Sequence, residues 1–320
     1  MPKKSVDDVS AGPKTVESKK DLDGIDLVDE AISVIGALPG RLRDSEGLPG
    51  GLVMFPEKIR PIIIGDLHSN KEHLEMILDH ENNRADLDSG KAACILLGDA
   101  LHDDRIGYMK EMSSSVEILE CVLRLIVRYP GQIYYIRGNH DTFDERLRKS
   151  GIAQGLELKN TLDAVKGKPY TASISRFFES LPVFVIGKGF VITHAGPPHG
   201  GIGRDELINI KKYPEKMHQL TWIRVNEFHG NPSLKEYGEN DIRLALKILD
   251  MPDTTQFIVG HNPIWSDGNK IGVWLNVIGI KNHHILYSGY GSAAPYITFI
   301  GEEMQVKTAV VKKPEVYYYG

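Results

Sequence analysis

The spacing of apolar and polar residues predicts strands that alternate with helices in the first half of the chain. Three short apolar runs predict buried strands, each with a glycine at or next to its last position: residues 59–66, 92–99 and 132–138. Helical spacing of apolar residues follows these runs at residues 70–81, 114–130 and 143–150. Strands that alternate with helices are typical of an α/β sheet with helices packed against it.

The rest of the chain predicts one more helix and a second sheet. Apolar residues recur at helical spacing in residues 26–38. Residues 182–196 predict a hairpin that turns at 187–189, and residues 254–263 predict another strand. Short apolar runs broken by glycine and asparagine fill residues 271–311. We therefore expect a second sheet with more antiparallel pairing than the first.

Composition excludes several classes of partner. The chain has 320 residues, a net charge of -5 and 41% hydrophobic residues, which is ordinary for a globular protein. It has no dense block of lysine and arginine, so neither nucleic acid nor an anionic membrane is the expected partner. The sequence has no stretch of about 18 unbroken apolar residues, so no membrane-spanning helix is predicted.

The same features suggest the domain organisation and the compartment. Residues 1–22 are polar and are expected to form a disordered tail, and no polar linker divides residues 23–320, which we expect to be one catalytic domain. The two cysteines, Cys94 and Cys121, lie in apolar runs and are expected to be buried thiols. We therefore expect a cytoplasmic protein.

Polar residues that can bind metal or transfer a proton follow the predicted strands. They are Asp66 at the end of the first run and His68 just beyond it, Asp99 at the end of the second, Asn139 and His140 after the third, and His194 and His261 at the ends of later strands. Any one of them could be a turn or capping residue. Because ligands of open α/β sheets lie beyond the carboxyl ends of strands, the repeated pattern instead predicts one shared site.

Six of these residues form a possible set of ligands for metal ions, with oxygen and nitrogen donors. Oxygen ligands from Asp66, Asp99 and Asn139 are combined with three imidazoles, those of His68, His194 and His261. With no thiolate, this set favours a divalent ion such as manganese, iron or zinc, with manganese our first expectation. Six ligands are too many for one tetrahedral zinc but suit a pair of ions about 3.5 to 4 Å apart that share a carboxylate. Asp99 could be that bridge.

Five motifs, in this order along the chain, carry a family resemblance: "GDLHSN", "LLGDALHDDRIG", "IRGNHD", "THAG" and "GHNP". Together they resemble the metallophosphoesterase superfamily, and specifically the phosphoprotein phosphatase family of serine/threonine phosphatases and related bacterial diadenosine tetraphosphatases. The motif "TWIR" at residues 221–224 is similar to one in the bacterial members. The resemblance implies a calcineurin-like four-layer α/β sandwich, in which two mixed β-sheets are flanked by helices.

The resemblance also implies a role for each site residue. One metal ion would be held by Asp66, His68 and Asp99, and the second by Asp99, Asn139, His194 and His261. His140 would be the general acid. Arg105 and Arg224 would bind the substrate phosphate, for which the planar guanidinium is suited.

One assignment stays open within the resemblance. Relatives have an Asp-Arg pair shortly after the bridging carboxylate, and its aspartate orients the catalytic histidine. Here the loop "ALHDDR" is longer, so that Asp104 and Arg105 match the pair only with a gap, whereas an alignment without a gap puts His102 in the orienting position. The chain also has Ser69 where relatives usually have glycine.

The expected function is hydrolysis of phosphomonoesters, foremost phosphoserine and phosphothreonine in proteins, by in-line attack of a hydroxide that bridges the two metal ions. The same site could instead hydrolyse dinucleoside polyphosphates, such as diadenosine tetraphosphate, or a small phosphorylated metabolite. A non-catalytic scaffold is the third alternative. The expected partner is thus a phosphorylated protein or a small phosphorylated molecule.

Overall fold

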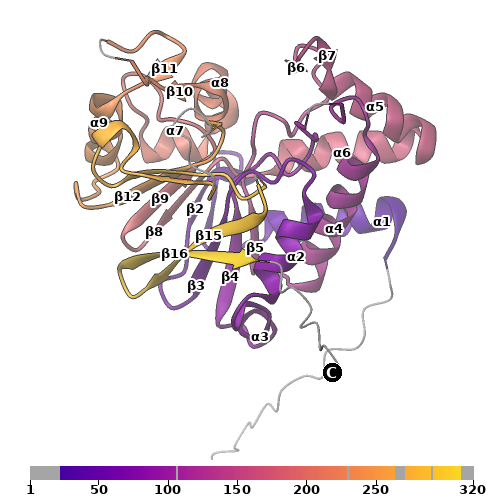
Figure 1. Cartoon of the computed structure of the whole chain (residues 1–320), viewed down its shortest axis with the longest axis horizontal. Coiled ribbons are helices and arrows are strands. Elements are labelled where there is room, and N and C mark those ends of the chain that lie inside the picture. The colour runs from indigo at the N-terminus through magenta and orange to yellow at the C-terminus, as the bar shows by residue number, and fades with distance from the viewer. Residues whose placement is uncertain (1–21, 106, 229–230, 264–270, 290, 311–320) are drawn as a thin grey trace, which may run out of the picture.

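The computed structural model describes residues 22–105, 107–228, 231–263, 271–289 and 291–310. The predicted polar tail, residues 1–22, lies outside the described residues except for Leu22. Two large β-sheets occupy the middle of the molecule and helices cover their outer sides (Figure 1). This mixed α/β architecture confirms the predicted sandwich of two mixed sheets flanked by helices. None of the helices in the described ranges is long and apolar enough to cross a membrane.

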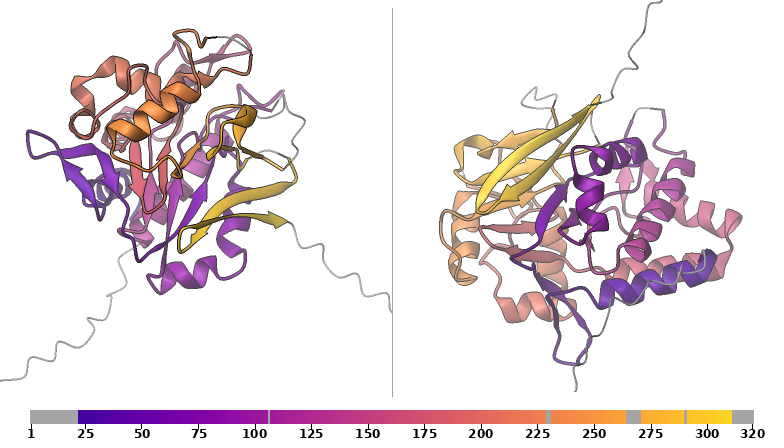
Figure 2. Two further views of the ribbon diagram at one scale, coloured as in Figure 1. Left: turned by 90° about the vertical axis from the view of Figure 1, so that its left-hand side faces the viewer. Right: turned by 90° about the horizontal axis from the view of Figure 1, so that it is seen from below.

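The first sheet has five strands in the order β16-β15-β3-β4-β5. Their bounds are β3 (Arg60–Ile64), β4 (Ala92–Leu96), β5 (Ile133–Tyr135), β15 (Ala293–Ile300) and β16 (Glu303–Val310). The strands β3, β4 and β5 are parallel, as their alternation with helices predicted. The C-terminal hairpin β15–β16 lies beside β3 and pairs with it in antiparallel fashion (Figure 2). The hairpin therefore completes the first sheet, although its sequence suggested the second.

The second sheet has seven strands in the order β1-β2-β8-β9-β12-β14-β13. Their bounds are β1 (Arg41–Arg43), β2 (Pro49–Met54), β8 (Phe184–Gly187), β9 (Phe190–Thr193), β12 (Gln256–Val259), β13 (Val273–Leu275) and β14 (His283–Leu286). The predicted hairpin is confirmed as β8–β9. The pairs β2–β8, β9–β12 and β12–β14 are parallel and the other three pairs are antiparallel. The first sheet is evenly mixed as well, so the prediction that the second sheet is more antiparallel than the first was wrong.

The helices pack in two groups, one on each outer side of the sheets (Figure 1). One group contains α1 (Gly24–Gly36), α2 (Lys71–Asp79), α3 (Asn83–Asp88), α4 (Ser113–Arg128), α5 (Gln154–Val165) and α6 (Lys168–Ser180). The other contains α7 (Arg204–Ile208), α8 (Pro214–Trp222) and α9 (Glu239–Ile248). Within the described residues, 3-10 helices cover Ile210–Lys212 and Val277–Gly279.

The helix predicted at residues 143–150 is absent. The segment turns instead at Asp144, whose carboxylate accepts the backbone N–H of Arg146 at 2.9 Å, and it then forms the hairpin β6 (Arg148–Lys149) and β7 (Ile152–Ala153). An aspartate that bonds its neighbouring backbone competes with helix formation. The next helix therefore begins only at Gln154.

A buried arginine fastens the N-terminal helix to the sandwich. Arg41 donates to the backbone oxygens of Ile35 at 2.9 Å, Gly50 at 2.9 Å and Ser180 at 2.7 Å. These acceptors lie in α1, β2 and α6, so one side chain joins three elements. Burial lowers the pKa of Arg41 to about 10, and three carbonyl acceptors satisfy the charge that remains.

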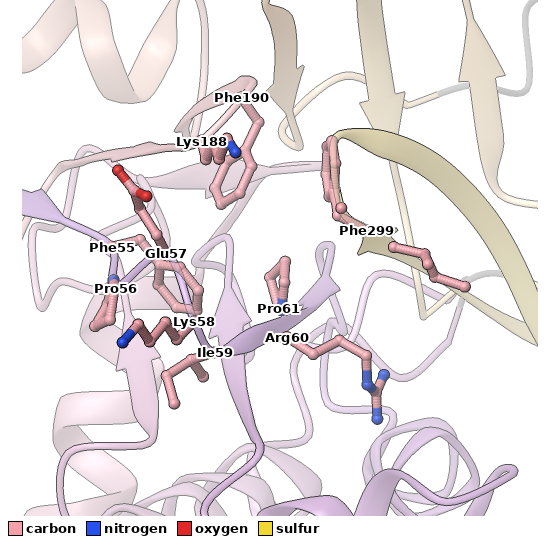
Figure 3. A pocket seen from close by; sticks show the side chains of 12 residues that line it. Phe55, Pro56, Glu57, Lys58, Ile59, Arg60, Pro61, Lys188, Phe190 and Phe299 are labelled. Carbon is pink, nitrogen blue, oxygen red and sulfur yellow. The ribbon is translucent and has the colours of Figure 1, made fainter.

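The seam between the two sheets is closed by aromatic side chains at one end. The ring of Phe190 lies 5.9 Å from that of Phe55 and 4.9 Å from that of Phe299, between ring centres. These rings line a cavity of about 230 Å³ (Figure 3). Arg60 lines it as well, but its guanidinium points away and donates to Asp86 at 2.7 Å. This end of the interface between the two sheets lies where β3 and β9 begin.

Candidate metal centre

The residues singled out in the sequence meet at the other end of the same strands. Asp66 and His68 follow β3, Asp99 follows β4, Asn139 and His140 follow β5, His194 follows β9, and His261 follows β12. Since β3, β4 and β5 are parallel and β9 is parallel to β12, their carboxyl ends lie at common edges. Both sheets therefore contribute side chains to one centre.

The first cluster is built around the amide of Asn139. Its Oδ1 lies 3.0 Å from Nε2 of His194 and 2.9 Å from Nδ1 of His261. Nε2 of His194 also lies 3.2 Å from Oδ2 of Asp99. All four side chains are buried. Asp99, His194 and His261 bring their ligand atoms close enough to hold one metal ion.

A second cluster shares Asp99 with the first. It contains His68, Asp99 and His140, whose ligand atoms all lie within 4.8 Å of one another. The resemblance placed Asp66 in this cluster, and the Asp66 carboxylate lies beside it, with Oδ2 at 3.8 Å from Nε2 of His68. Asp99 thus lies where one carboxylate can serve two ions.

The carboxylate of Asp66 provides a test of whether a cation fits. Oδ2 accepts the backbone N–H of His261 at 2.9 Å, whereas the buried Oδ1 has no hydrogen-bond partner among the described residues. A buried carboxylate oxygen without a partner is costly, and a divalent cation would compensate it. A Cβ placed on Gly260 would lie 2.0 Å from this oxygen. The glycine before His261 is therefore required for the two loops to approach.

The electrostatics of the centre also favour a cation. Burial, reinforced by the neighbouring charge of Asp99, raises the pKa of Asp66 well above its usual value. Burial acts in the same direction on Asp99, but the charges of His194 and His140 outweigh it and hold the pKa of Asp99 well below its usual value. Burial lowers the pKa of His194, yet the carboxylates of Asp99 and Asp66 raise it to about 9. The two buried carboxylates lie close to each other, and divalent ions would supply the positive charge that stabilises both in their ionised form.

Several centre residues have strained backbone conformations. His68, Asp99 and His261 have φ angles of 43°, 49° and 61°, in the left-handed region that non-glycine residues rarely adopt. Ser69 and His102 share this conformation, with φ angles of 65° and 64°. Such strain clusters at functional sites because surrounding structure holds ligands in fixed positions.

His140 contacts the ring of His102. The two Nδ1 atoms are 3.1 Å apart, and both rings are buried. The backbone N–H of His102 donates to Oγ of Ser115 at 3.0 Å, which pins the loop that carries His102 to the start of α4. Burial lowers the pKa of His102 to about 3, so this ring is neutral.

The carboxylate of Asp104 has other partners. Its Oδ2 accepts Nζ of Lys149 at 2.8 Å and the hydroxyl of Tyr287 at 2.6 Å. The contact with the His140 ring that the gapped alignment assigns to Asp104 is made by His102. The longer loop after Asp99 provides the physical reason, because it places His102 inside the centre and Asp104 at its edge.

The two arginines lie at the edge of the centre. The guanidinium of Arg105 donates to the Asp103 carboxylate through Nε at 2.9 Å, and its side chain is 69% exposed. Arg224 starts the short strand β10 (Arg224–Val225), which pairs with β11 (Glu236–Tyr237), and is exposed. Its charge, after burial and His194, contributes to lowering the pKa of His261. Arg224 therefore lies close enough to His261 for its charge to lower the pKa of that ring.

An open cleft of about 1070 Å³ leads away from His68. Its wall includes Asp104, Arg105 and Lys149 together with residues of α2 and the segment after β14. The seam cavity of Figure 3 lies at the opposite end of β3, and within the described ranges both metal-binding groups lie at the cleft end. Of the six proposed ligands, His68 is the one that lines this cleft.

Four further contacts were not anticipated from the sequence. Asp141 accepts the backbone N–H of Gly138 at 2.7 Å and the hydroxyl of Tyr135 at 2.5 Å, and burial raises its pKa to about 6. Nε2 of His261 donates to the backbone oxygen of Trp222 at 2.9 Å. Tyr287 stacks on His68. Of these, only Asp141 had a local signal, its place in the motif "GNHD".

Solved structures similar to this chain include several phosphatases. A protein serine/threonine phosphatase from Saccharomyces cerevisiae is 14% identical, with a TM-score of 0.64, over 91% of this chain and 90% of that one. A cold-active protein-tyrosine phosphatase from Shewanella is also 14% identical, with a TM-score of 0.51, over 81% and 82%. A putative diadenosine tetraphosphatase is 18% identical, with a TM-score of 0.46, over 82% and 100%.

No curated protein sequence matches the chain. The family model for calcineurin-like phosphoesterases matches residues 59–286, which contain the ligand residues of both clusters. That match covers more than half of the chain and agrees with the fold and with the acid-rich, histidine-rich centre between the sheets. The chain belongs to the calcineurin-like phosphoesterase family.

Proposed function

We propose that this chain is a two-metal phosphomonoesterase that hydrolyses phosphoserine and phosphothreonine in proteins. The observation that carries the proposal is the position of Asp99, which belongs to both potential metal-binding groups. One carboxylate shared between two ions is the arrangement that two-metal hydrolysis of phosphate esters requires. The open cleft beside His68 provides access for a substrate attached to a protein.

The proposed ligands are those expected from the sequence. Asp66, His68 and Asp99 would hold one ion, and Asp99, Asn139, His194 and His261 would hold the other. Such ions, with manganese first and iron or zinc as alternatives, activate water as a nucleophile and neutralise the phosphoryl oxygens. The ligands come from both sheets, so residues 23–320 would act as one catalytic domain.

His140 is the proposed proton donor to the leaving oxygen. Its Nδ1 is occupied by His102, which leaves Nε2 as the nitrogen available to the leaving oxygen. A ring held at one nitrogen keeps its tautomer and its direction, as a proton donor needs. We therefore assign the positioning of His140 to His102 and not to Asp104.

Arg224 and Arg105 are the proposed phosphate-binding residues. A guanidinium can donate two parallel hydrogen bonds to phosphoryl oxygens. Arg224 lies nearer to the ligands, since its charge acts on His261, and we expect it to be the main contact. Arg105 is paired with Asp103 and would have to exchange this partner for the substrate.

The charge of the cleft favours a phosphoprotein over a dinucleoside polyphosphate. Its wall carries the carboxylates of Glu72, Glu75 and Glu117. Lys71, the neighbouring cation on α2, is already paired with Glu117 at 2.6 Å. A polyphosphate chain would bring several negative charges to a wall that has no surplus of cations, and like charges repel.

A parallel measurement of kcat/KM tests the proposal. Manganese-loaded protein is assayed with phosphoserine and phosphothreonine peptides, diadenosine tetraphosphate and p-nitrophenyl phosphate. We expect the phosphopeptides to give higher kcat/KM than the dinucleotide. A higher value for diadenosine tetraphosphate would transfer the assignment to dinucleoside polyphosphates. Protein that holds two ions and hydrolyses none of these substrates would be a scaffold.

A further inference from the structure

A row of contacts connects the surface of the cleft to a ligand of the metal centre. Lys149 and the hydroxyl of Tyr287 both donate to Oδ2 of Asp104, at 2.8 Å and 2.6 Å. The ring of Tyr287 in turn stacks on the imidazole of His68, with 5.3 Å between ring centres and 26° between ring planes. The row therefore runs from Lys149 through Asp104 and Tyr287 to His68.

These residues come from separate parts of the chain. Lys149 is in the hairpin strand β6, Asp104 is in the loop after β4, and Tyr287 directly follows β14. Tyr287 is 3% exposed, and the side chain of Asp104 is 13% exposed. Hydrogen bonds from a cation and a phenol to one partly buried carboxylate are short and strong, because one partner is charged. They hold the Tyr287 ring in a fixed place.

Among the described residues, one further hydrogen bond orients His68. Its Nδ1 lies 3.0 Å from the backbone oxygen of His102, which directs Nε2 toward the centre. A hydrogen bond at one ring nitrogen fixes the tautomer but still permits the ring to tilt about the bond. The stacked Tyr287 ring limits this tilt on one face, and the edge-on ring of His140, at 5.0 Å, limits it elsewhere.

We propose that Tyr287, tethered by Asp104 and Lys149, is a positioning residue for His68 and sets the affinity of the ion that His68 holds. This inference rests on the two-metal centre of the proposed function and does not depend on its substrate. It also gives Asp104 a role different from the one that the family resemblance suggested. Contacts beyond the first ligands commonly change metal affinity by about 10- to 100-fold.

Tyr287→Phe tests the tether directly, since it keeps the ring and removes the hydroxyl. Mn²⁺ is titrated into metal-free protein and its two dissociation constants are measured by calorimetry. We expect one constant to rise by about 10-fold or more and the other to stay within about twofold. The same titration of His68→Ala identifies which constant belongs to the ion at His68.

Tyr129→Phe is the matched control. The Tyr129 hydroxyl also donates to an aspartate, Asp88, at 2.8 Å, but it lies between α3 and the end of α4. Both variants lose a tyrosine-to-carboxylate hydrogen bond, so both should lower the unfolding midpoint by similar amounts. Only Tyr287→Phe should change a metal dissociation constant.

Asp104→Asn and Lys149→Met provide a second measurement. Each change should weaken the binding of the ion at His68. When either is combined with Tyr287→Phe, the rise in the dissociation constant should be smaller than the sum of the separate effects, because all three changes break one row of contacts. Wild-type protein with two ions, together with Tyr287→Phe constants equal to those of Tyr129→Phe, would overturn this inference and leave the proposed function intact. Wild-type protein that binds fewer than two ions would overturn both.

Discussion

His102 and His140 meet through their Nδ1 atoms, 3.1 Å apart, inside the metal centre. At this distance one nitrogen must carry the proton and the other must accept it. Burial lowers the pKa of each ring, that of His102 to about 3, so the His102 ring is neutral. The ring that orients the proposed proton donor is therefore an uncharged imidazole.

Removing this partner should affect substrates selectively. We expect His102→Ala to lower turnover of phosphoserine peptides by about 10-fold or more, because His140 loses its fixed tautomer and direction. Turnover of p-nitrophenyl phosphate, whose leaving group departs without a proton, should change much less. Initial rates on both substrates at saturating manganese provide the measurement. A selective loss in Asp104→Asn with none in His102→Ala would return the positioning role to Asp104.

His140 itself should show the larger selective loss. His140→Asn should reduce turnover of phosphoserine peptides by roughly 100-fold or more, because the serine alkoxide is a strong base that needs a proton. The same change should reduce turnover of p-nitrophenyl phosphate far less. Asn139→Ala is the comparison, since loss of a metal ligand should reduce both rates alike. Equal losses on both substrates for His140→Asn, with metal content unchanged, would exclude His140 as the proton donor.

Asp99 should be the most sensitive of the metal ligands. Asp99→Asn removes a charge that both metal-binding groups share, so we expect it to weaken the binding of both ions. His261→Ala should weaken mainly the binding of one ion. Elemental analysis after dialysis should find about two ions per wild-type chain. Asp99→Asn protein that retained two ions and wild-type turnover would show that this carboxylate does not bridge them.

The two arginines should differ in their contribution. Arg224→Ala should raise the barrier to hydrolysis by about 3 kcal/mol without loss of metal, as expected when a group that stabilises transition-state charge is removed. Arg105→Ala should cost less, because Arg105 is exposed and already paired with Asp103. The values of kcat/KM and the metal content of both variants check this order. Arg224→Lys should recover only part of the rate, since it keeps the charge and loses the paired donors.

Ser69 provides a prediction about stability. Its φ angle of 65° is unfavourable for a residue with a side chain, but its hydroxyl lies 2.9 Å from that of Ser115. Ser69→Ala loses the hydrogen bond and keeps the strain, so it should destabilise the fold by about 1 kcal/mol. Ser69→Gly also loses the bond but relieves the strain, and should be about 1 kcal/mol more stable than Ser69→Ala. Urea denaturation of the two variants measures the difference.

Local patterns in the sequence were enough to identify the strands that carry the centre and the residues that follow them. The strands β3, β4 and β5 are apolar at every buried position, and polar ligands follow each strand within a few residues. Such information lies within a few neighbouring residues. Ligand chemistry and the order of the five motifs added the family, which the match to residues 59–286 confirms.

Features that depend on distant residues were decided only by the tertiary structure. The hairpin β15–β16 joined the first sheet because it pairs with β3, more than 200 residues earlier. In the same way, His102 reached His140 while Asp104, two residues later, reached Tyr287. A loop's neighbours in space depend on how the surrounding elements pack, and local spacing contains no record of that packing.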